Sequence, residues 1–311
     1  MNYSFCDKAF EKLVNKFGYL FNTYYTRRNK MKVRYLLIGV VVLFAASLLF
    51  AVSSEARMDP KTIAGIWLFD EGKGKDVKDS SGNENNGTLA NEPKWVDGKF
   101  GKAMTFDGVS TYVDCGNGEN LDITKEITVM AWVKFSGLDF KGGGGNLFSI
   151  GAKGYPDALA PHAGWWFSYD NRSNGQGFPY ACFGNKTGGW SGGGNSFAGY
   201  TFVFTNGDWY HLAFTVAKSI AKLYIDGVQL NADKTFSNLV LSDTSRDLFI
   251  GCADRSWFFN GAIDEFAIFN VQLGEQDIQT IMNEGLEKST TFAVDFKNKL
   301  ATTWGSLRKV N

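Results

Sequence analysis

The chain has 311 residues, with 32 Lys and Arg against 32 Asp and Glu, and its 36 glycines and 15% aromatic content accompany only 5 prolines. Abundant glycine and aromatic residues are typical of short strands joined by tight turns, and they exclude a helical bundle, which would be richer in Ala, Leu and Glu. Lys and Arg are concentrated in the first 56 positions, so the remainder is net acidic. This charge distribution excludes nucleic acid as an expected partner.

The amino-terminal part carries a targeting signal. Residues 36–52 form an uncharged run of apolar or small residues, preceded by basic residues and followed by Ser53–Ala56. This pattern is typical of a secretory signal, and the run is short for a membrane span of about 20 residues. We predict that residues 1–56 are an extension plus a signal peptide cleaved after Ala56, with Met31 as a second candidate start. The product would be extracellular, on the cell surface or periplasmic. Retention in a membrane through residues 36–52 is the alternative.

From residue 63 the chain shows many short β-rich segments separated by turn residues. In chain order, strands are predicted at 63–69, 103–106, 111–114, 127–134, 209–216, 222–225, 228–230, 248–250 and 262–269. Asp226-Gly227 predicts a two-residue hairpin of the primed type. Only residues 275–284 have apolar residues at helical spacing. The pattern predicts an all-β, two-sheet antiparallel β-sandwich over residues 57–285 with one short C-terminal helix, followed by a tail, residues 286–311.

The cysteines leave two alternatives open. Cys115, Cys182 and Cys252 follow the predicted signal, and Cys6 precedes it. Export would permit a disulfide bond, although an odd number leaves at least one thiol over. Small buried side chains on strands are the other interpretation.

Five sequence blocks follow one another between residues 62 and 285. They are Trp67–Gly72 with Asp79–Asn83 and Asn86–Leu89; Trp95 with Gly98–Gly101 and Met104–Gly108; Ile127–Val133; Asp208–Ala213 with Lys222–Gly227; and Gly261–Asn270 with the helix that follows. Together they resemble the laminin-G-like jelly-roll family of secreted bacterial proteins, whose fold is that of concanavalin A. The resemblance implies the fold rather than a ligand, because this fold serves lectins, adhesins and glycosidases.

Catalytic chemistry is not expected. Glycosidases of this fold place two Glu and one Asp at alternate positions of one strand, so that all three face the sugar. No such run occurs here, and the adjacent Asp264 and Glu265 are expected to point to opposite faces. His162 and His211 have no Ser or Cys in a nucleophile motif beside them. A glycoside hydrolase is therefore the least favoured function.

The resemblance also implies a structural calcium ion between the first and last strands. Calcium takes six to eight oxygen ligands from carboxylates and backbone carbonyls. The candidate ligands are Asp70, Asp107, the backbone of Gly108, and Asp264. In the alternative interpretation, Asp70 and Asp107 only stabilise turns, and Asp264 belongs to a buried hydrogen-bond network.

One aromatic and glycine-rich region, residues 142–200, suggests sugar binding. Exposed aromatic rings stack on sugars, and long loops on a rigid sandwich often carry function. The candidate ligand-binding residues are Trp166, Asp170, Asn171, Arg172, Trp190 and Asn195. The alternative is that the aromatic side chains belong to the core. We predict a carbohydrate-binding or adhesion module whose partner is a glycan or cell-surface polymer; the alternative from another class is a structural or protein-interaction module of the cell envelope.

Overall fold

The computed structural model describes residues 58–92, 94–138, 147–154, 162–173, 176–185, 196–198, 202–230, 233–236, 239–241 and 246–291. The chain divides into two units, residues 1–56 and 57–311. The predicted signal or anchor, residues 36–52, lies outside the described residues. Within the described part of the chain, no helix is long and apolar enough to cross a membrane.

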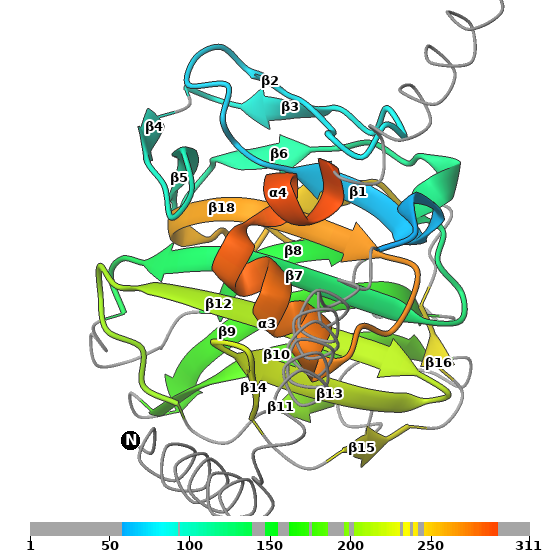
Figure 1. Ribbon diagram of the computed structural model, residues 1–311. Coiled ribbons are helices and arrows are strands. Elements are labelled where there is room, and N and C mark those ends of the chain that lie inside the picture. Colours follow the sequence, from blue (N-terminus) through cyan, green and yellow to red (C-terminus); the bar gives the residue numbers. More distant parts are fainter. Residues whose placement is uncertain are drawn as a thin grey trace, which may run out of the picture. The chain divides into compact units, whose positions relative to one another are not determined.

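The described strands form two antiparallel sheets (Figure 1). The first sheet has the spatial order β14 (Val228–Gln229), β13 (Ile220–Ile225), β12 (Trp209–Ala217), β7 (Ile127–Phe135), β18 (Asn260–Phe269), β5 (Lys102–Asp107) and β4 (Lys94–Asp97), with β1 (Ile63–Trp67) on β18 and β15 (Lys234–Thr235) on β13. The second has the order β11 (Ser196–Ala198), β10 (Gln176–Asn185), β9 (His162–Ser173), β8 (Leu147–Lys153), β17 (Leu248–Ile250), β6 (Tyr112–Asp114), β3 (Gly87–Ala90) and β2 (Asp76–Val77), with β16 (Leu239–Val240) on β10. The predicted β-sandwich is confirmed.

The core lies between the two sheets and is built by the period of two along each strand. On β9, Trp165, Phe167 and Tyr169 point into the core, while Trp166 and Ser168 point to the outer face of the second sheet. The core is strongly aromatic; the Trp67 ring, for example, packs 5.8 Å from the Phe266 ring. This alternation fixes which side chains can reach a ligand on the outer face.

Helices cover the outer face of the first sheet. The predicted helix is confirmed as α3 (Glu275–Glu284), and its Ile278 and Ile281 pack against apolar residues of that sheet. A second helix, α4 (Leu286–Thr291), follows at once, and Leu286 is fully buried. In Figure 1 both helices lie across this sheet, so the outer face of the second sheet is the one they leave uncovered.

The structure decides two local questions, the hairpin turn predicted at Asp226-Gly227 and the state of the cysteines. Asp226 and Gly227 have φ values of 48° and 74° between β13 and β14, as a primed hairpin turn requires. Cys115, Cys182 and Cys252 are all buried and free, so the cysteines serve as small core side chains rather than as a disulfide. Burial raises the pKa of the Cys252 thiol to about 12, which leaves it protonated at neutral pH.

Candidate functional site

Three carboxylates lie together where the first and last strands meet the β4–β5 turn. The Asp264 Oδ2 atom accepts hydrogen bonds from the backbone N–H groups of Lys99 and Phe100, at 2.7 and 3.0 Å. The Asp70 Oδ1 atom accepts one from the N–H of Lys102 at 2.6 Å. We call Asp70, Asp264 and Glu265 the carboxylate cluster. The turn over residues 97–102 thus wraps two of its members in backbone donors.

Two glycines make this close wrapping possible. A Cβ atom on Gly98 would lie 2.5 Å from Asp264 Oδ2, and one on Gly101 would lie 2.0 Å from Asp70 Oδ1. Gly101 also has a φ of +52°, a conformation that other residues adopt only at a cost. The Gly-x-x-Gly spacing recognised in the sequence therefore has a physical role at the carboxylate cluster.

Burial and neighbouring charges raise the pKa values of Asp264 and Glu265. Asp264 is fully buried, and this burial, reinforced by the nearby charge of Asp70, raises its pKa to about 7 despite the two backbone hydrogen bonds. Burial raises the pKa of Glu265 to about 8, with further contributions from the charges of Asp264 and Asp70, while the N–H of Leu286 donates to Glu265 Oε2 at 2.9 Å. Buried carboxylates repelling one another favour their neutral forms.

The expectation that Asp264 and Glu265 point to opposite faces is wrong. The pairing of β18 with β7 shifts register between Asp264 and Ala267, and Glu265 has a φ of 49°. A β-bulge of this kind breaks the period of two and brings neighbouring side chains to one side. Both carboxylates therefore approach the same turn, although both are buried beneath it.

Asp107 and Gly108 lie apart from the carboxylate cluster. Asp107 pairs with Asn260 on β18, four residues from Asp264, which is roughly 13 Å along a strand. Its Oδ1 atom accepts from the N–H groups of Val109, Ser110 and Thr111. Burial alone would raise the pKa of Asp107, but these hydrogen bonds outweigh it and hold the pKa well below its usual range. Of the four candidate metal ligands, the structure brings together only Asp70 and Asp264.

The cluster fits a hard cation in chemistry but offers few side-chain ligands. The Asp264 Oδ1 atom is buried and has no hydrogen-bond partner among the described residues. The backbone carbonyls of Phe100 and Lys102 lie beside the same turn, close to the Cβ position of Gly98. Across the described residues, no group of three or more His, Cys, Asp and Glu is spaced to hold a metal. A calcium ion would therefore take Asp264 and Asp70 plus backbone carbonyls.

The predicted aromatic platform differs from the structure. Trp166 is only 4% exposed, because its ring packs between Trp257, at a centroid distance of 4.9 Å, and Tyr180, at 6.1 Å. Asp170 is 6% exposed on the same outer face of β9. Trp166 and Asp170 are therefore not accessible to a ligand. The side chains of Asn171 and Arg172, and all of Trp190 and Asn195, lie outside what the structure describes.

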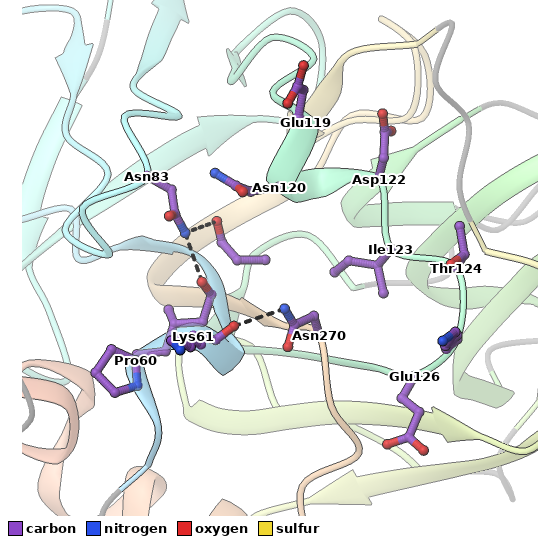
Figure 2. Close-up of a pocket in the computed structure, with 13 residues that line it drawn as sticks. Pro60, Lys61, Asn83, Glu119, Asn120, Asp122, Ile123, Thr124, Glu126 and Asn270 are labelled. Atoms are coloured by element: carbon purple, nitrogen blue, oxygen red, sulfur yellow. Dashed lines mark hydrogen bonds between the residues drawn. The ribbon is translucent and has the colours of Figure 1, made fainter.

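An open cavity of about 630 Å³ lies at one rim of the sandwich (Figure 2). We call it the rim cavity, and its size is in the usual range for a small-molecule site. It is formed by the start of β1, the β2–β3 loop, the segment after β6 and the end of β18, and its lining residues are Pro60, Lys61, Ile63, Ala64, Asn83, Glu119, Asn120, Asp122, Ile123, Thr124, Lys125, Glu126 and Asn270. None of these residues is aromatic.

The side-chain amides of two asparagines in the rim cavity are held by hydrogen bonds to the backbone of β1 and of the residues just before it. Asn83 Nδ2 donates to the carbonyls of Ile63 and Ala64 at 2.8 and 3.1 Å, and Asn270 Nδ2 donates to the carbonyl of Lys61 at 3.0 Å (Figure 2). Since the NH₂ groups donate to these carbonyls, the amide oxygens point away from them, and these oxygens are hydrogen-bond acceptors. Acceptors with a fixed orientation suit the hydroxyl groups of a ligand.

The charges around the rim cavity balance. Three carboxylates line it, from Glu119, Asp122 and Glu126, together with the ammonium groups of Lys61 and Lys125. The fully buried Lys153 supplies a further positive charge, because its Nζ lies 3.2 Å from Asp122 Oδ1. A near-neutral polar cavity favours a neutral hydroxylated ligand over a phosphate, a sulfate or a free cation.

His211, which has no nucleophile motif beside it in the sequence, is a buried packing residue. Its side chain is 2% exposed on β12 and packs 5.3 Å from the ring of Trp132. Burial lowers the pKa of His211 to about 3, so it stays neutral and is not available as a proton donor at neutral pH.

Sequence reasoning missed the residues of the rim cavity. Asn83, the adjacent pair Glu119 and Asn120, and Asn270 lie in three segments far apart in the chain, and nothing in their local pattern joins them. A weak signal existed around Asn83, because residues 79–87 form a polar stretch rich in turn-forming Ser, Asn and Gly.

Comparison with known proteins gives the family. A family model described as the concanavalin A-like lectin/glucanases superfamily matches residues 107–279. Domain 4 of AbnA, a GH43 extracellular arabinanase from Geobacillus stearothermophilus solved with arabinotriose, is 22% identical with a TM-score of 0.54, and the match covers 71% of this chain and 98% of that domain. No curated protein sequence matches the chain significantly.

Two further solved structures share the fold. The binding domain of Paraclostridial Mosquitocidal Protein 1 is 16% identical with a TM-score of 0.55, over 72% of this chain and 52% of that one. Trypanosoma rangeli sialidase is 16% identical with a TM-score of 0.50, over 71% of this chain and 33% of the sialidase. The chain thus spans about half of the toxin domain and a third of the enzyme. Because the family model covers more than half of its length, the chain belongs to the concanavalin A-like lectin/glucanase superfamily.

Proposed function

We propose that this protein is a non-catalytic binding or adhesion module, exported to the cell surface or beyond, that takes a neutral glycan in its rim cavity. The observation that carries the proposal is the rim cavity, an open polar hollow with two asparagine amides held in place by the backbone of β1 and its approach. Its balanced charges match a ligand that offers hydroxyl groups. The extracellular setting is supported by the predicted signal segment and by the extracellular arabinanase with the same fold.

A binding role is favoured over a hydrolytic one by where the acids lie. Glycoside hydrolysis requires two carboxylates that flank a bound sugar, with one of them at a raised pKa. The described acids with raised pKa values are Asp264 and Glu265, and both are buried beneath the β4–β5 turn. The acids of the rim cavity are accompanied by lysines. This arrangement supports recognition of a glycan rather than cleavage.

Variants of the rim cavity test this function. Glu119 and Asn120 are exposed and form no part of the core, so Glu119→Gln and Asn120→Ala should leave the unfolding temperature unchanged. Each should weaken the binding of neutral oligosaccharides about tenfold, since a lost hydrogen bond to a ligand costs about 1–1.5 kcal/mol. Isothermal titration against a panel of arabino-, xylo-, manno- and gluco-oligosaccharides gives the affinities. Lys78→Ala, on an exposed residue outside the cavity, is the matched control. Unchanged affinities in both cavity variants would contradict the proposed site.

We also propose that calcium binds at Asp70 and Asp264 as a structural ion. Millimolar calcium should raise the unfolding temperature at pH 8 by several degrees, because a ligand of the folded state stabilises it by mass action. Asp70→Asn should abolish the shift. Asp107→Asn should retain it, since Asp107 belongs to a separate turn. Differential scanning calorimetry with and without a chelator measures both, and a wild-type transition insensitive to calcium would exclude the ion.

A further inference from the structure

We propose that Asn117 is a site of covalent self-modification, at which the backbone nitrogen of Gly118 attacks the side-chain amide while the buried ammonium group of Lys153 activates that amide. The first product is a succinimide ring, which water opens to aspartate or isoaspartate. The reaction belongs to the chain itself, so it does not depend on what the rim cavity binds.

The reaction needs no partner other than water. The Gly118 nitrogen forms a bond to Asn117 Cγ and loses its proton, and the Cγ–Nδ2 bond breaks to release ammonia, which carries that proton away. Water then adds to one of the two ring carbonyls and breaks its bond to the ring nitrogen, so that a carboxylate replaces the amide. A glycine in the second position favours ring closure, because no Cβ atom obstructs the attacking nitrogen.

Lys153 places a positive charge on the atom where negative charge develops. Its Nζ donates to Asn117 Oδ1 at 2.5 Å, and the Lys153 side chain is fully buried at the end of β8. As the nitrogen attacks, the amide oxygen becomes an oxyanion, and a cation already in contact with that oxygen stabilises it without reorganisation. Burial of the ammonium group strengthens this interaction, because solvent and salt screen it less.

Other contacts hold the ammonium group in this position. Lys153 Nζ also lies 3.2 Å from Asp122 Oδ1 and 2.9 Å from the carbonyl oxygen of Arg246. These two acceptors come from different segments of the chain, so the ammonium group keeps its place while the Asn117 amide changes shape. Charge-assisted hydrogen bonds of this kind are the strong ones in proteins.

The backbone around Asn117 leaves the attacking nitrogen available. The Gly116 carbonyl accepts from the Leu248 N–H at 2.8 Å, and the Gly118 carbonyl accepts from the Leu121 N–H at 2.9 Å. Among the described residues, by contrast, none accepts a hydrogen bond from the N–H of Gly118. Asn117 is an exposed residue, so water can reach its amide and ammonia can leave.

Three other Asn-Gly pairs of the described chain lie in settings that protect them. They are Asn86-Gly87, Asn206-Gly207 and Asn260-Gly261, and a further pair at 174–175 lies outside the described residues. The Gly207 N–H donates to the Phe135 carbonyl at 3.0 Å, and the glycines of the other two pairs lie within β3 and β18. The amide oxygens of the first two pairs accept from backbone N–H groups, at 2.9 and 3.0 Å, rather than from a cation. The fold therefore singles out Asn117.

The reaction changes the charge beside the rim cavity. The new carboxylate at position 117 meets the ammonium group that Asp122 already contacts, so two carboxylates share one cation. Around the rim cavity, the balance of three carboxylates against three ammonium groups becomes an excess of one negative charge. A change in glycan affinity would follow from this and rests on the proposed function, whereas the reaction does not.

The ratio of the reaction rates in the folded and the unfolded chain tests the inference. The full-length chain is kept in mildly alkaline buffer with or without guanidinium chloride, and mass spectrometry of its peptides follows every Asn-Gly pair. Folding should accelerate the reaction of Asn117 at least tenfold, since one donor to a developing oxyanion is typically worth a factor of about 100 or more. The pairs at Asn86, Asn206 and Asn260 are internal controls, and folding should slow them.

Lys153→Met isolates the role of the ammonium group. The variant keeps the apolar stem, and its folded chain should modify Asn117 no faster than the unfolded chain does. Lys222→Met is the matched control, because Lys222 is a partly buried lysine of β13 that lies 3.5 Å from Asp233, and it should keep the acceleration. If Lys153→Met does not fold, the comparison of folded with unfolded wild type decides by itself.

The outcomes are distinct. An acceleration at Asn117 that is lost in Lys153→Met supports the inference, and so does a freshly isolated chain already converted at position 117 but not at the other three pairs. A folded rate at Asn117 equal to or below the unfolded rate overturns it, as does an acceleration that survives in Lys153→Met. Peptides that have lost one ammonia and stay joined through positions 117 and 153 would show that Lys153 itself attacks the amide, which also overturns it. None of these readouts involves a glycan, so failure of the rim cavity as a glycan site is measured separately.

Discussion

The free energy of unfolding of this protein will fall as the pH rises from about 4 to about 8 in the absence of calcium. The reason lies in Asp264 and Glu265, whose pKa values in the folded state, about 7 and about 8, exceed the ordinary 3.8 and 4.5. The folded state keeps both protons over this range while the unfolded state releases them, so proton release favours unfolding. Each raised pKa contributes on the order of 2–4 kcal/mol to the free energy of unfolding. This contribution is fully present when the pH is below the ordinary pKa, and it is lost once the pH has risen through the pKa of the folded state.

Asp264→Asn isolates one half of this effect. An asparagine oxygen can still accept from the N–H groups of Lys99 and Phe100, and it carries no charge to bury. The variant should be more stable than wild type by about 2–4 kcal/mol at pH 8 and nearly equal to it at pH 4. Urea unfolding with a chelator at the two pH values gives the comparison. A variant less stable than wild type at pH 8 would show that Asp264 is not the source of the pH dependence.

Lys153→Ala should lower the free energy of unfolding by about 3–5 kcal/mol at neutral pH. Lys153 is fully buried at the end of β8, where its Nζ lies 3.2 Å from Asp122 Oδ1 and 2.9 Å from the carbonyl of Arg246. Removing the ammonium group leaves a partly buried carboxylate without that cation. Because Asp122 lines the rim cavity, glycan affinity should fall as well.

The double variant Lys153→Met with Asp122→Asn is the control for this prediction. It removes both charges while keeping the apolar stem, so it should recover most of the stability, as replacement of a whole buried ion pair often does. Urea unfolding of Lys153→Met, of Asp122→Asn and of the double variant gives the coupling free energy between the two charges. A loss below about 1 kcal/mol in Lys153→Ala would mean that solvent reaches this lysine.

Most of the fold was predictable because it is encoded in local patterns. The alternation of Ile127, Val129 and Val133 gives the inward face of β7, and the spacing of Ile278 and Ile281 gives α3. The Asp226-Gly227 turn is likewise specified by two residues with positive φ. Periods of 2 and 3.6 depend on neighbours in sequence, so one sequence suffices to read them.

The site was less predictable because it depends on departures from those patterns and on contacts between distant segments. A β-bulge at Asp264–Glu265 reverses the expected facing of a carboxylate, and no residue type in the sequence marks it. Trp166 is of the residue type expected to stack on a sugar, but its ring is covered by Trp257, which lies 91 positions later in the chain. Asp107 carries a carboxylate, the ligand type expected for calcium. Its Oδ1 atom instead accepts hydrogen bonds from backbone N–H groups of its own turn.

The most direct test of the central claim, binding of neutral glycans without catalysis, combines two measurements on the same samples. The full-length chain is titrated with the panel of neutral oligosaccharides and polysaccharides, and the release of new reducing ends is followed over days. We predict saturable binding to at least one neutral glycan, weakened by Glu119→Gln or Asn120→Ala, with no release of reducing ends. Release of reducing ends by the wild-type chain, or the absence of binding to every glycan tested, would contradict the claim.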